Sequence, residues 1–182
     1  MRTLLRGITR RSSSSISRKR LLIAWHSMTG GSQQMAEAAY RGAVIESGFS
    51  VDVTLLHASM VKPSHIVETD GFIFVTPENL AAMSGLMKDM FDRTYYPALG
   101  KLNGRPYSVM ICAGSDGENA ARQVARIATG WRLKQVSPPL IVCTHSQTPE
   151  TILAAKVISP ADLERCEDVG KAIAAGLGLG VF

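Results

Sequence analysis

The feature that most constrains this chain is a regular alternation of short apolar runs with segments of helical period. Continuous apolar runs such as 21–25 (LLIAW) are typical of strands buried on both faces of a parallel sheet. Strands that alternate strictly with helices predict an α/β, doubly wound, three-layer architecture. The expected strands are 21–25, 51–56, 71–77, 107–113 and 140–144. The expected helices are 32–47, a short one near Pro63, 84–93, 118–134, a short turn at Thr148-Pro149-Glu150 and one beginning at Ser159-Pro160.

The second expected strand predicts the order of the sheet. Residues 51–56 (VDVTLL) alternate between apolar and polar, which is typical of a strand with one exposed face at a sheet edge. This placement selects a five-stranded parallel sheet in the flavodoxin-like order 2-1-3-4-5. Ligands of such sheets bind outside the carboxyl ends of the strands, where the order reverses between the first and third strands. The loops 26–32, 77–84 and 113–118 are therefore the candidate ligand-binding segments.

The positive charge of the chain is concentrated at its N-terminus. The net charge is +5, but residues 1–20 hold seven Lys and Arg and no acidic residue, which leaves 13 Lys and Arg against 15 Asp and Glu in the remainder. The body is thus mildly acidic, and a face that binds a nucleic-acid backbone is not indicated. No apolar run approaches the roughly 18 residues of a membrane-spanning helix, so no membrane span is expected.

Residues 1–20 (MRTLLRGITRRSSSSISRKR) are expected to be a disordered basic leader ahead of one domain over 21–182. Their Arg-rich, Ser-rich and acid-free composition is typical of an organelle transit peptide. A flexible tail and a start codon assigned too far upstream are the alternatives, and they are favoured because nothing else in the chain indicates an organelle. A cytoplasmic location is therefore predicted.

The three cysteines, Cys112, Cys143 and Cys166, have no spacing that is typical of a metal site. No metal is predicted. An odd number of cysteines in a domain of this size indicates a reducing compartment without a disulfide framework. Cys112 and Cys143 lie at the ends of two expected strands and could approach each other, but small buried side chains are the preferred interpretation.

The first candidate loop (HSMTGGS, 26–32) combines hydroxyl side chains with two glycines before a helix. Gly30 and Gly31 let backbone N–H groups approach a phosphate, the hydroxyls can donate, and the helix N-terminus adds a partial positive charge. A tight turn with an N-cap is the alternative. The loop lacks both the G-K-[ST] of nucleotide hydrolases and the G-x-G-x-x-G of dinucleotide-binding proteins.

The other two loops suit a flat polar ring. In TPENLAAMSG (76–85), a proline bend and the Asn79 amide could flank a ring and bond its edge, and in AGSDGE (113–118) two glycines surround Ser115 and Asp116. Each loop alone is also ordinary turn chemistry. Three such loops at the positions that the topology selects indicate a mononucleotide, with its phosphate on the first loop and its ring between the others.

HSMTGGS fits the [ST]-x-T-G-x-[ST] phosphate loop, and the similarity continues through TPENLAAMSGLMKDMFDR and AGSDGENAARQVARIATGWRL. The chain thereby resembles the NAD(P)H-dependent FMN reductase and quinone reductase branch of the flavodoxin superfamily. The resemblance implies a flavodoxin-like fold, bound FMN, NAD(P)H as cosubstrate and a quinone, flavin or similar small molecule as electron acceptor. The FMN-binding residues that it implies are Ser27, Met28, Thr29, Gly30, Gly31, Ser32 and Gln33 at the phosphate, and Thr76, Pro77, Glu78, Asn79, Leu80, Gly114, Ser115, Asp116 and Gly117 around the ring and ribityl chain.

The second loop departs from electron-carrier flavodoxins because it has no aromatic residue to stack on the flavin; it has Ala81, Ala82 and Ser84 instead. An open ring face favours an enzyme that takes hydride from NAD(P)H and passes electrons on. The alternatives are a flavodoxin-type electron-transfer protein without substrate turnover and a flavin-free binding module. No catalytic residue is assigned: hydride transfer needs no histidine base, so His26 and His145 are interpreted as structural. Homo-oligomerisation stays open.

Overall fold

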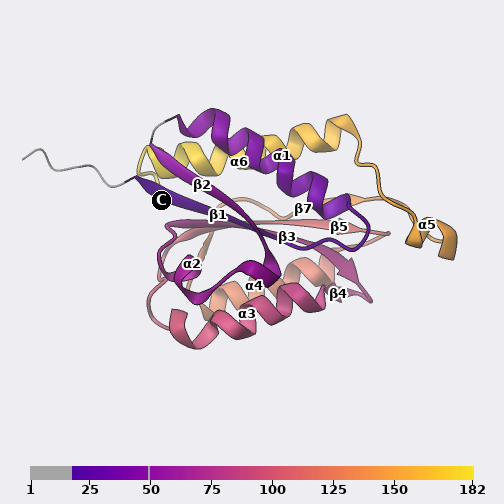
Figure 1. Cartoon of the computed structure of the whole chain (residues 1–182), viewed down its shortest axis with the longest axis horizontal. Helices are drawn as coiled ribbons and strands as arrows, with labels where there is room; N and C mark the ends of the chain where they lie inside the picture. The colour runs from indigo at the N-terminus through magenta and orange to yellow at the C-terminus, as the bar shows by residue number, and fades with distance from the viewer. Residues whose placement is uncertain (1–17, 49) are drawn as a thin grey trace, which may run out of the picture.

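A parallel sheet lies between two layers of helices in the computed structural model, which describes residues 18–48 and 50–182 (Figure 1). Two long helices cover one face, α1 (Gly31–Ser47) and α6 (Pro160–Gly178). Three helices cover the other face, α2 (Pro63–Val67), α3 (Gly85–Ala98) and α4 (Glu118–Gly130). The doubly wound α/β architecture expected from the sequence is confirmed.

The sheet contains the expected order of strands but more strands than expected. Its path is β2-β1-β3-β5-β6, and β7 also pairs with β5. The strands of this path, together with β7, are β1 (Lys19–Trp25), β2 (Val51–His57), β3 (Gly71–Asn79), β5 (Pro106–Ala113), β6 (Lys134–Gln135) and β7 (Leu140–Cys143). The order 2-1-3-4-5 is confirmed, because β6 and β7 both occupy the fifth position, beside successive parts of β5.

The expected count of five strands is wrong, because the structure has seven. The fifth position is divided between β6 and β7 by Pro138 and Pro139, which have no N–H to donate to β5. The remaining strand, β4 (Ala82–Met83), pairs antiparallel with Glu78 and Asn79 at the end of β3. It forms a hairpin that the sequence analysis did not predict.

Several element boundaries differ from the expected ones; α3, for example, extends to Ala98 instead of residue 93. β1 begins at Lys19, inside the expected leader, and is anchored there by ion pairs from Arg18 to Asp52 (3.1 Å) and from Arg20 to Glu68 (2.7 Å). The rest of the expected disordered leader, residues 1–17, lies outside the described residues. α4 ends at Gly130 instead of residue 134, because the following residues turn back into β6.

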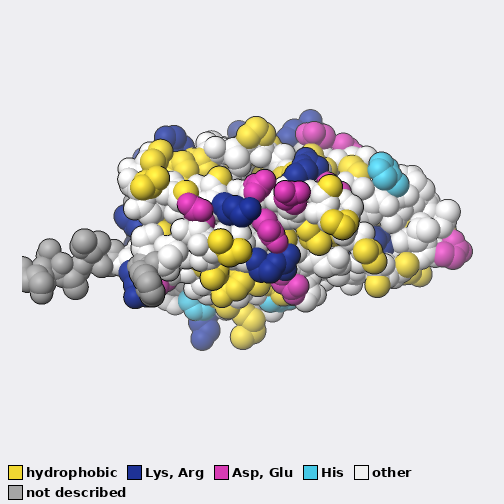
Figure 2. Space-filling model, turned by 90° about the horizontal axis from the view of Figure 1, so that it is seen from above, with side chains coloured by type: hydrophobic (Ala, Val, Ile, Leu, Met, Phe, Trp, Pro, Cys, Tyr) yellow, Lys and Arg dark blue, Asp and Glu magenta, His cyan; other side chains and the backbone are white. Residues whose placement is uncertain are grey.

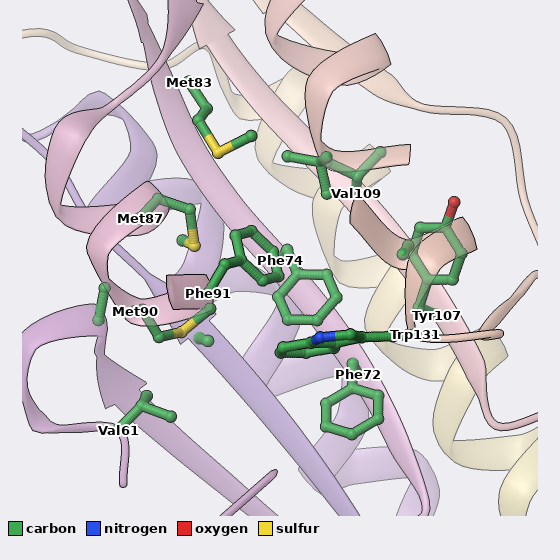
Figure 3. Close-up of a cluster of buried hydrophobic side chains, with 14 of the residues drawn as sticks. Val61, Phe72, Phe74, Met83, Met87, Met90, Phe91, Tyr107, Val109 and Trp131 are labelled. Carbon is green, nitrogen blue, oxygen red and sulfur yellow. The ribbon is translucent and has the colours of Figure 1, made fainter. Parts of the chain in front are cut away.

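The core beneath α3 and α4 is aromatic (Figure 3). Phe74 meets Phe91 edge to face with ring centroids 5.0 Å apart, and Phe91 meets Trp131 in the same way at 5.3 Å. On the opposite face, α1 and α6 cross where Gly42 faces the backbone of Glu167, and a Cβ there would overlap the Glu167 carbonyl. The small residues on the buried face of α1 therefore serve close packing against α6.

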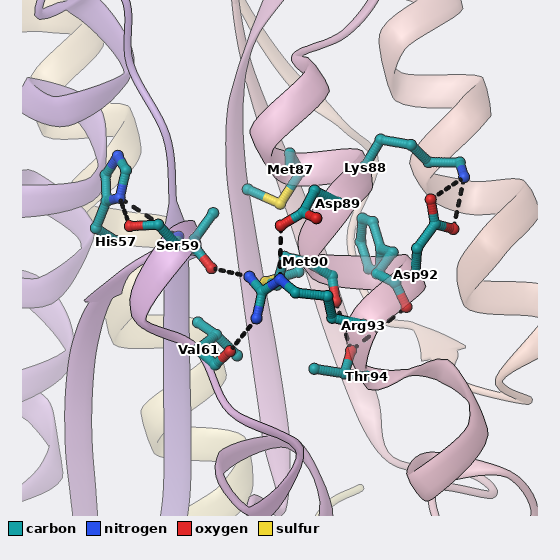
Figure 4. Close-up of polar contacts among 12 residues, drawn as sticks. His57, Ser59, Val61, Met87, Lys88, Asp89, Met90, Asp92, Arg93 and Thr94 are labelled. Carbon is teal, nitrogen blue, oxygen red and sulfur yellow. Dashed lines mark hydrogen bonds and ion pairs between the residues drawn. The ribbon is translucent and has the colours of Figure 1, made fainter.

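Polar contacts hold α3 against the segment after β2, where the short helix η1 (Ala58–Met60) follows the strand (Figure 4). The Arg93 guanidinium donates to the carbonyls of Val61 and Ala58, both at 2.9 Å, and pairs with Asp89 at 2.6 Å. These bonds fix α3, whose first residue follows directly on the β3–β4 hairpin.

The face above α1 and α6 carries acidic and basic side chains side by side (Figure 2). Ion pairs join Arg41 to Glu167 and Lys171 to Asp168 on these helices. No helix among residues 18–48 and 50–182 is long and apolar enough to cross a membrane.

Candidate functional site

The three candidate loops meet at the carboxyl end of the sheet and surround a cavity of about 480 Å³. Its walls come from the loop after β1, the β3–β4 hairpin, the end of β5 and the segment after β7, which includes the short helix α5 (Pro149–Leu153). The volume lies within the range of small-molecule sites. The sequence-predicted residues that line the cavity are Ser27, Met28, Thr29, Gly31, Ser32, Pro77, Glu78, Asn79, Leu80, Gly114 and Ser115.

The first loop presents the start of α1 to the cavity. The N-cap residue Gly30 has φ +86° and makes no side-chain cap, while its N–H donates to Ser27 Oγ at 2.9 Å. The first N–H groups of a helix have no partner within the helix. Ser32 Oγ is also buried, and beyond a weak contact with the Cys112 thiol it has no hydrogen-bond partner among the described residues. One wall of the cavity thus holds donors that a bound anion could satisfy.

Gly31 is glycine because of its neighbours. A Cβ added there would lie 2.5 Å from Cys112 Sγ on β5 and 3.3 Å from Lys156 Cβ on the segment after β7. Carbon atoms in ordinary contact are about 3.5–4.0 Å apart. Gly30 is different, because its nearest neighbour would be Gln34 Nε2 at 3.8 Å and only its positive φ requires glycine.

Five predicted site residues do not line the cavity: Gly30, Gln33, Thr76, Asp116 and Gly117. Gln33 bonds Glu37 on the exposed side of α1 at 2.9 Å. Thr76 is fully buried, and its hydroxyl lies 3.0 Å from the hydroxyl of Ser84, the N-cap of α3. Gly117, at φ +85°, donates its N–H to Glu78 Oε2 at 2.9 Å. These residues shape the loops that line the cavity.

The β3–β4 hairpin has a strained tip. Leu80 (φ +50°) and Ala81 (φ +58°) form a two-residue connection in which both residues are left-handed, a turn that normally favours Asn and Gly. Left-handed backbone costs a residue with a Cβ about 1–2 kcal/mol. α4 supports the hairpin, because Gln123 Oε1 accepts from Met83 N at 2.9 Å. The tip places Leu80, wholly exposed, at the cavity mouth.

Glu78 joins the hairpin to the third loop. One carboxylate oxygen accepts the Gly117 N–H, and the other, Oε1, is buried without a partner among the described residues. Asn79 follows it along the cavity wall. Of the three small residues expected to leave a ring uncovered, only Ala81 lines the cavity, since Ala82 lies in β4 and Ser84 caps α3.

Sequence reasoning missed the fourth wall of the cavity, which the segment after β7 forms. The missed lining residues of this wall are Thr144, Ser146, Ile152, Leu153 and Lys156, and Cys112 on β5 was missed as well. The turn at Thr148-Pro149 indicated the short helix α5. Its position depends on contacts between residues more than 120 positions apart, which no local pattern reports.

A three-bond clasp joins the fourth wall to the first loop. Lys156 N donates to Thr29 O at 2.8 Å. The Gln34 amide then bridges to the same segment: its Nε2 donates to Lys156 O at 2.6 Å, and its Oε1 accepts from Ile158 N at 3.1 Å. The backbone of Lys156 is thus fixed beside the start of α1.

The cysteines near the cavity are free, and they lie on opposite faces of the sheet. Cys112 packs with the α1 and α6 core, whereas Cys143 packs with the α3 and α4 core and its Sγ lies 3.9 Å from Asp116 O. Burial raises the pKa of the Cys112 thiol to about 11. The buried-thiol interpretation is confirmed for Cys112 and Cys166, and Cys143 is partly exposed.

Neither His26 nor His145 lines the cavity. His26 is 5% exposed, and its ring meets that of His57 edge to face at 5.5 Å. Burial lowers the pKa of His26, and the neighbouring His57 lowers it further. These positions agree with the structural role expected of both residues.

The comparisons with known proteins agree with the fold and with the family that the sequence resembles. Residues 64–147 match the family described as NADPH-dependent FMN reductase. An NAD(P)H dehydrogenase (quinone) of Acidithiobacillus ferrooxidans is 33% identical over 111 residues, 50% of this chain and 56% of that protein. An NAD(P)H-dependent FMN reductase of Schizosaccharomyces pombe is 27% identical over 111 residues, 61% of this chain and 52% of that protein. The chain spans about half the length of these relatives.

Solved structures agree in fold. A flavodoxin from the domain Archaea has a TM-score of 0.69 at 19% identity, covering 87% of this chain and 98% of that one. A WrbA-like flavodoxin of Agrobacterium tumefaciens has a TM-score of 0.68 at 18% identity, covering 87% and 97%. The chain therefore has the flavodoxin-like fold, and its resemblance to the NAD(P)H-dependent FMN reductase family is confirmed over residues 64–147.

Proposed function

We propose that this protein is an FMN-binding oxidoreductase that transfers electrons from NAD(P)H to a quinone, a flavin or a similar small acceptor. The observation that carries the proposal is the cavity itself, which brings the uncapped start of α1 and the buried Ser32 hydroxyl together with Glu78 and Asn79 of the β3–β4 hairpin. The matched family and the names of the two relatives support the same activity.

The first loop fits a phosphate monoester. The uncapped start of α1 and the buried Ser32 hydroxyl offer donors to phosphate oxygens, and the hydroxyls of Ser27 and Thr29 stand beside them. Helix N-termini bind anions through their N–H groups and their partial positive charge. Without a bound anion, the buried Ser32 hydroxyl lacks a strong partner and so carries a cost.

The opposite end fits a flavin ring. The pyrimidine edge of a flavin carries carbonyl acceptors and an N–H donor, and the cavity supplies complementary groups in Asn79 and in the unpartnered Glu78 oxygen. Pro77 and Leu80 add apolar surface along the same wall. FMN, when bound, would supply the hydride- and electron-transfer chemistry, while these residues would bind and orient it.

The lining of the cavity leaves a bound ring uncovered by aromatic side chains. None of its lining residues, all within the described part of the chain, is Phe, Tyr or Trp. Hydride transfer needs the two reacting atoms about 3–3.5 Å apart, so the nicotinamide must stack on an uncovered flavin face. This observation favours an enzyme over the alternative, an electron-transfer protein that covers its flavin with aromatic side chains. The free cysteines fit the reducing cytoplasm that we propose as its location.

Fluorescence titration with FMN tests the proposal, with Ser32→Ala as the diagnostic variant. Because Ser32 Oγ meets only the weakly bonding Cys112 thiol among the described residues, its removal should change the thermal midpoint little and weaken FMN binding about tenfold, the worth of one good hydrogen bond. Ser64→Ala, an exposed serine on α2, is the matched control and should bind as the parent does. Absence of FMN binding by the parent would refute the proposal.

A further inference from the structure

One basic side chain lines the cavity. The loop from His26 to Gln33 contains no Lys or Arg, and among the lining residues, all of them described, Lys156 alone carries a positive charge. We propose that Lys156, from the segment after β7, supplies the cation that binds the phosphate of the cofactor. The inference rests on the proposed function and adds a residue from a distant part of the chain to the phosphate subsite.

The backbone of Lys156 is held against the phosphate loop. Its N–H donates to Thr29 O at 2.8 Å, and its carbonyl accepts from Gln34 Nε2 at 2.6 Å. Its Cβ lies 3.3 Å from the position that a Cβ of Gly31 would occupy. The side chain therefore starts next to the first turn of α1, where the buried Ser32 hydroxyl and the uncapped N–H groups lie.

The ammonium group is bonded to neutral acceptors in this structure. Lys156 Nζ donates to the carbonyls of Thr151 (2.7 Å), Ile152 (2.9 Å) and Ala154 (2.6 Å) around the end of α5. These bonds join the ammonium to carbonyl dipoles, whereas a phosphate would offer it a full negative charge. The flexible four-carbon stem lets Nζ move to a phosphate without any change of the clasped backbone.

The charge already acts on this part of the site. Burial is the main cause of the raised pKa of the Cys112 thiol, and Lys156 opposes that rise. Cys112 Sγ is the atom that a Cβ on Gly31 would meet first. The ammonium therefore stabilises negative charge close to the start of α1, as a phosphate subsite requires.

Paired titrations with FMN and riboflavin test the inference, because the two ligands differ only by the phosphate. Lys156→Met should lower FMN affinity at least about tenfold, equivalent to about 1.4 kcal/mol, and leave riboflavin affinity within about twofold. Lys156→Arg keeps the charge and should retain FMN binding within about threefold. Lys101→Met, an equal charge change in the exposed loop after α3, should bind both ligands as the parent does.

Three results would overturn the inference. Equal losses for FMN and riboflavin in Lys156→Met would show that the residue acts by holding α5, and unchanged FMN affinity would show that it binds no phosphate. A thermal shift with inorganic phosphate gives a readout without flavin: phosphate should stabilise the parent and not Lys156→Met, and equal shifts would also overturn the inference. If the parent binds neither flavin, the proposed function fails, whereas the phosphate shift still reports on Lys156.

Discussion

Substitution of Gly31 by Ala tests how tightly the phosphate loop is built. The new Cβ would lie 2.5 Å from Cys112 Sγ, about 1 Å inside normal contact, and 3.3 Å from the clasped Lys156 Cβ. Overpacking of this kind costs about 1–3 kcal/mol. At about 2–4 °C per kcal/mol for a chain of this size, the thermal midpoint should fall by about 2–12 °C. FMN affinity should fall as well, because the start of α1 must move.

Circular dichroism melts of a double-mutant cycle identify the cause. Cys112→Ala removes the sulfur, so Gly31→Ala should cost less in that background, with a coupling of about 0.5–3 kcal/mol. Gly85→Ala is the matched control, because nothing lies within 4 Å of its added Cβ at the start of α3, and it should be neutral or stabilising by about 0.4–1 kcal/mol. Additive costs in the cycle, or a Gly31→Ala midpoint equal to that of the control, would refute the reasoning.

Three further predictions follow from single side chains. Leu80→Trp should suppress NADPH oxidation far more than FMN binding, because an indole at this exposed tip can cover the ring; equal losses in the two assays would contradict this. Arg105→Met should lower the free energy of unfolding in urea by about 2–3 kcal/mol, since the guanidinium donates to three carbonyls around the end of α2; an unchanged value would show that these carbonyls need no cap. The lowered pKa of His26 means that the unfolded chain binds its proton first, so stability should fall as pH drops below about 6.5 and fall less in His26→Gln; parallel pH profiles would contradict it.

The fold was predictable because its signals are local. The buried strands 71–77 and 107–113 are mostly apolar, and the alternating strand 51–56 lies at the sheet edge as expected. The divided fifth strand could not be predicted, because β6 has only two residues and follows the helical pattern of α4 almost directly. No apolar run marks β6, and Pro138 and Pro139 separate it from β7. The β3–β4 hairpin was missed because its turn uses Leu80 and Ala81, without the Asn or Gly that marks such a turn.

The candidate site was predictable as far as topology places it. Loops at the carboxyl ends of β1, β3 and β5 had to meet, and Ser27, Glu78 and Ser115 all line one cavity. Sequence alone could not separate the residues that face the cavity from those that support it, such as the buried Thr76. It also could not place Lys156 beside Thr29, since that contact depends on the tertiary path of the segment after β7.

The most direct test of the central proposal is anaerobic mixing of the FMN-loaded protein with NADPH or NADH, followed by absorbance near 450 nm. The proposed oxidoreductase predicts rapid loss of the flavin band with at least one of the two nucleotides, and its recovery when a quinone is added, because the open cavity admits a nicotinamide to the ring. A flavin band that persists with both nucleotides would contradict the proposal and would favour an electron-transfer protein without nicotinamide turnover.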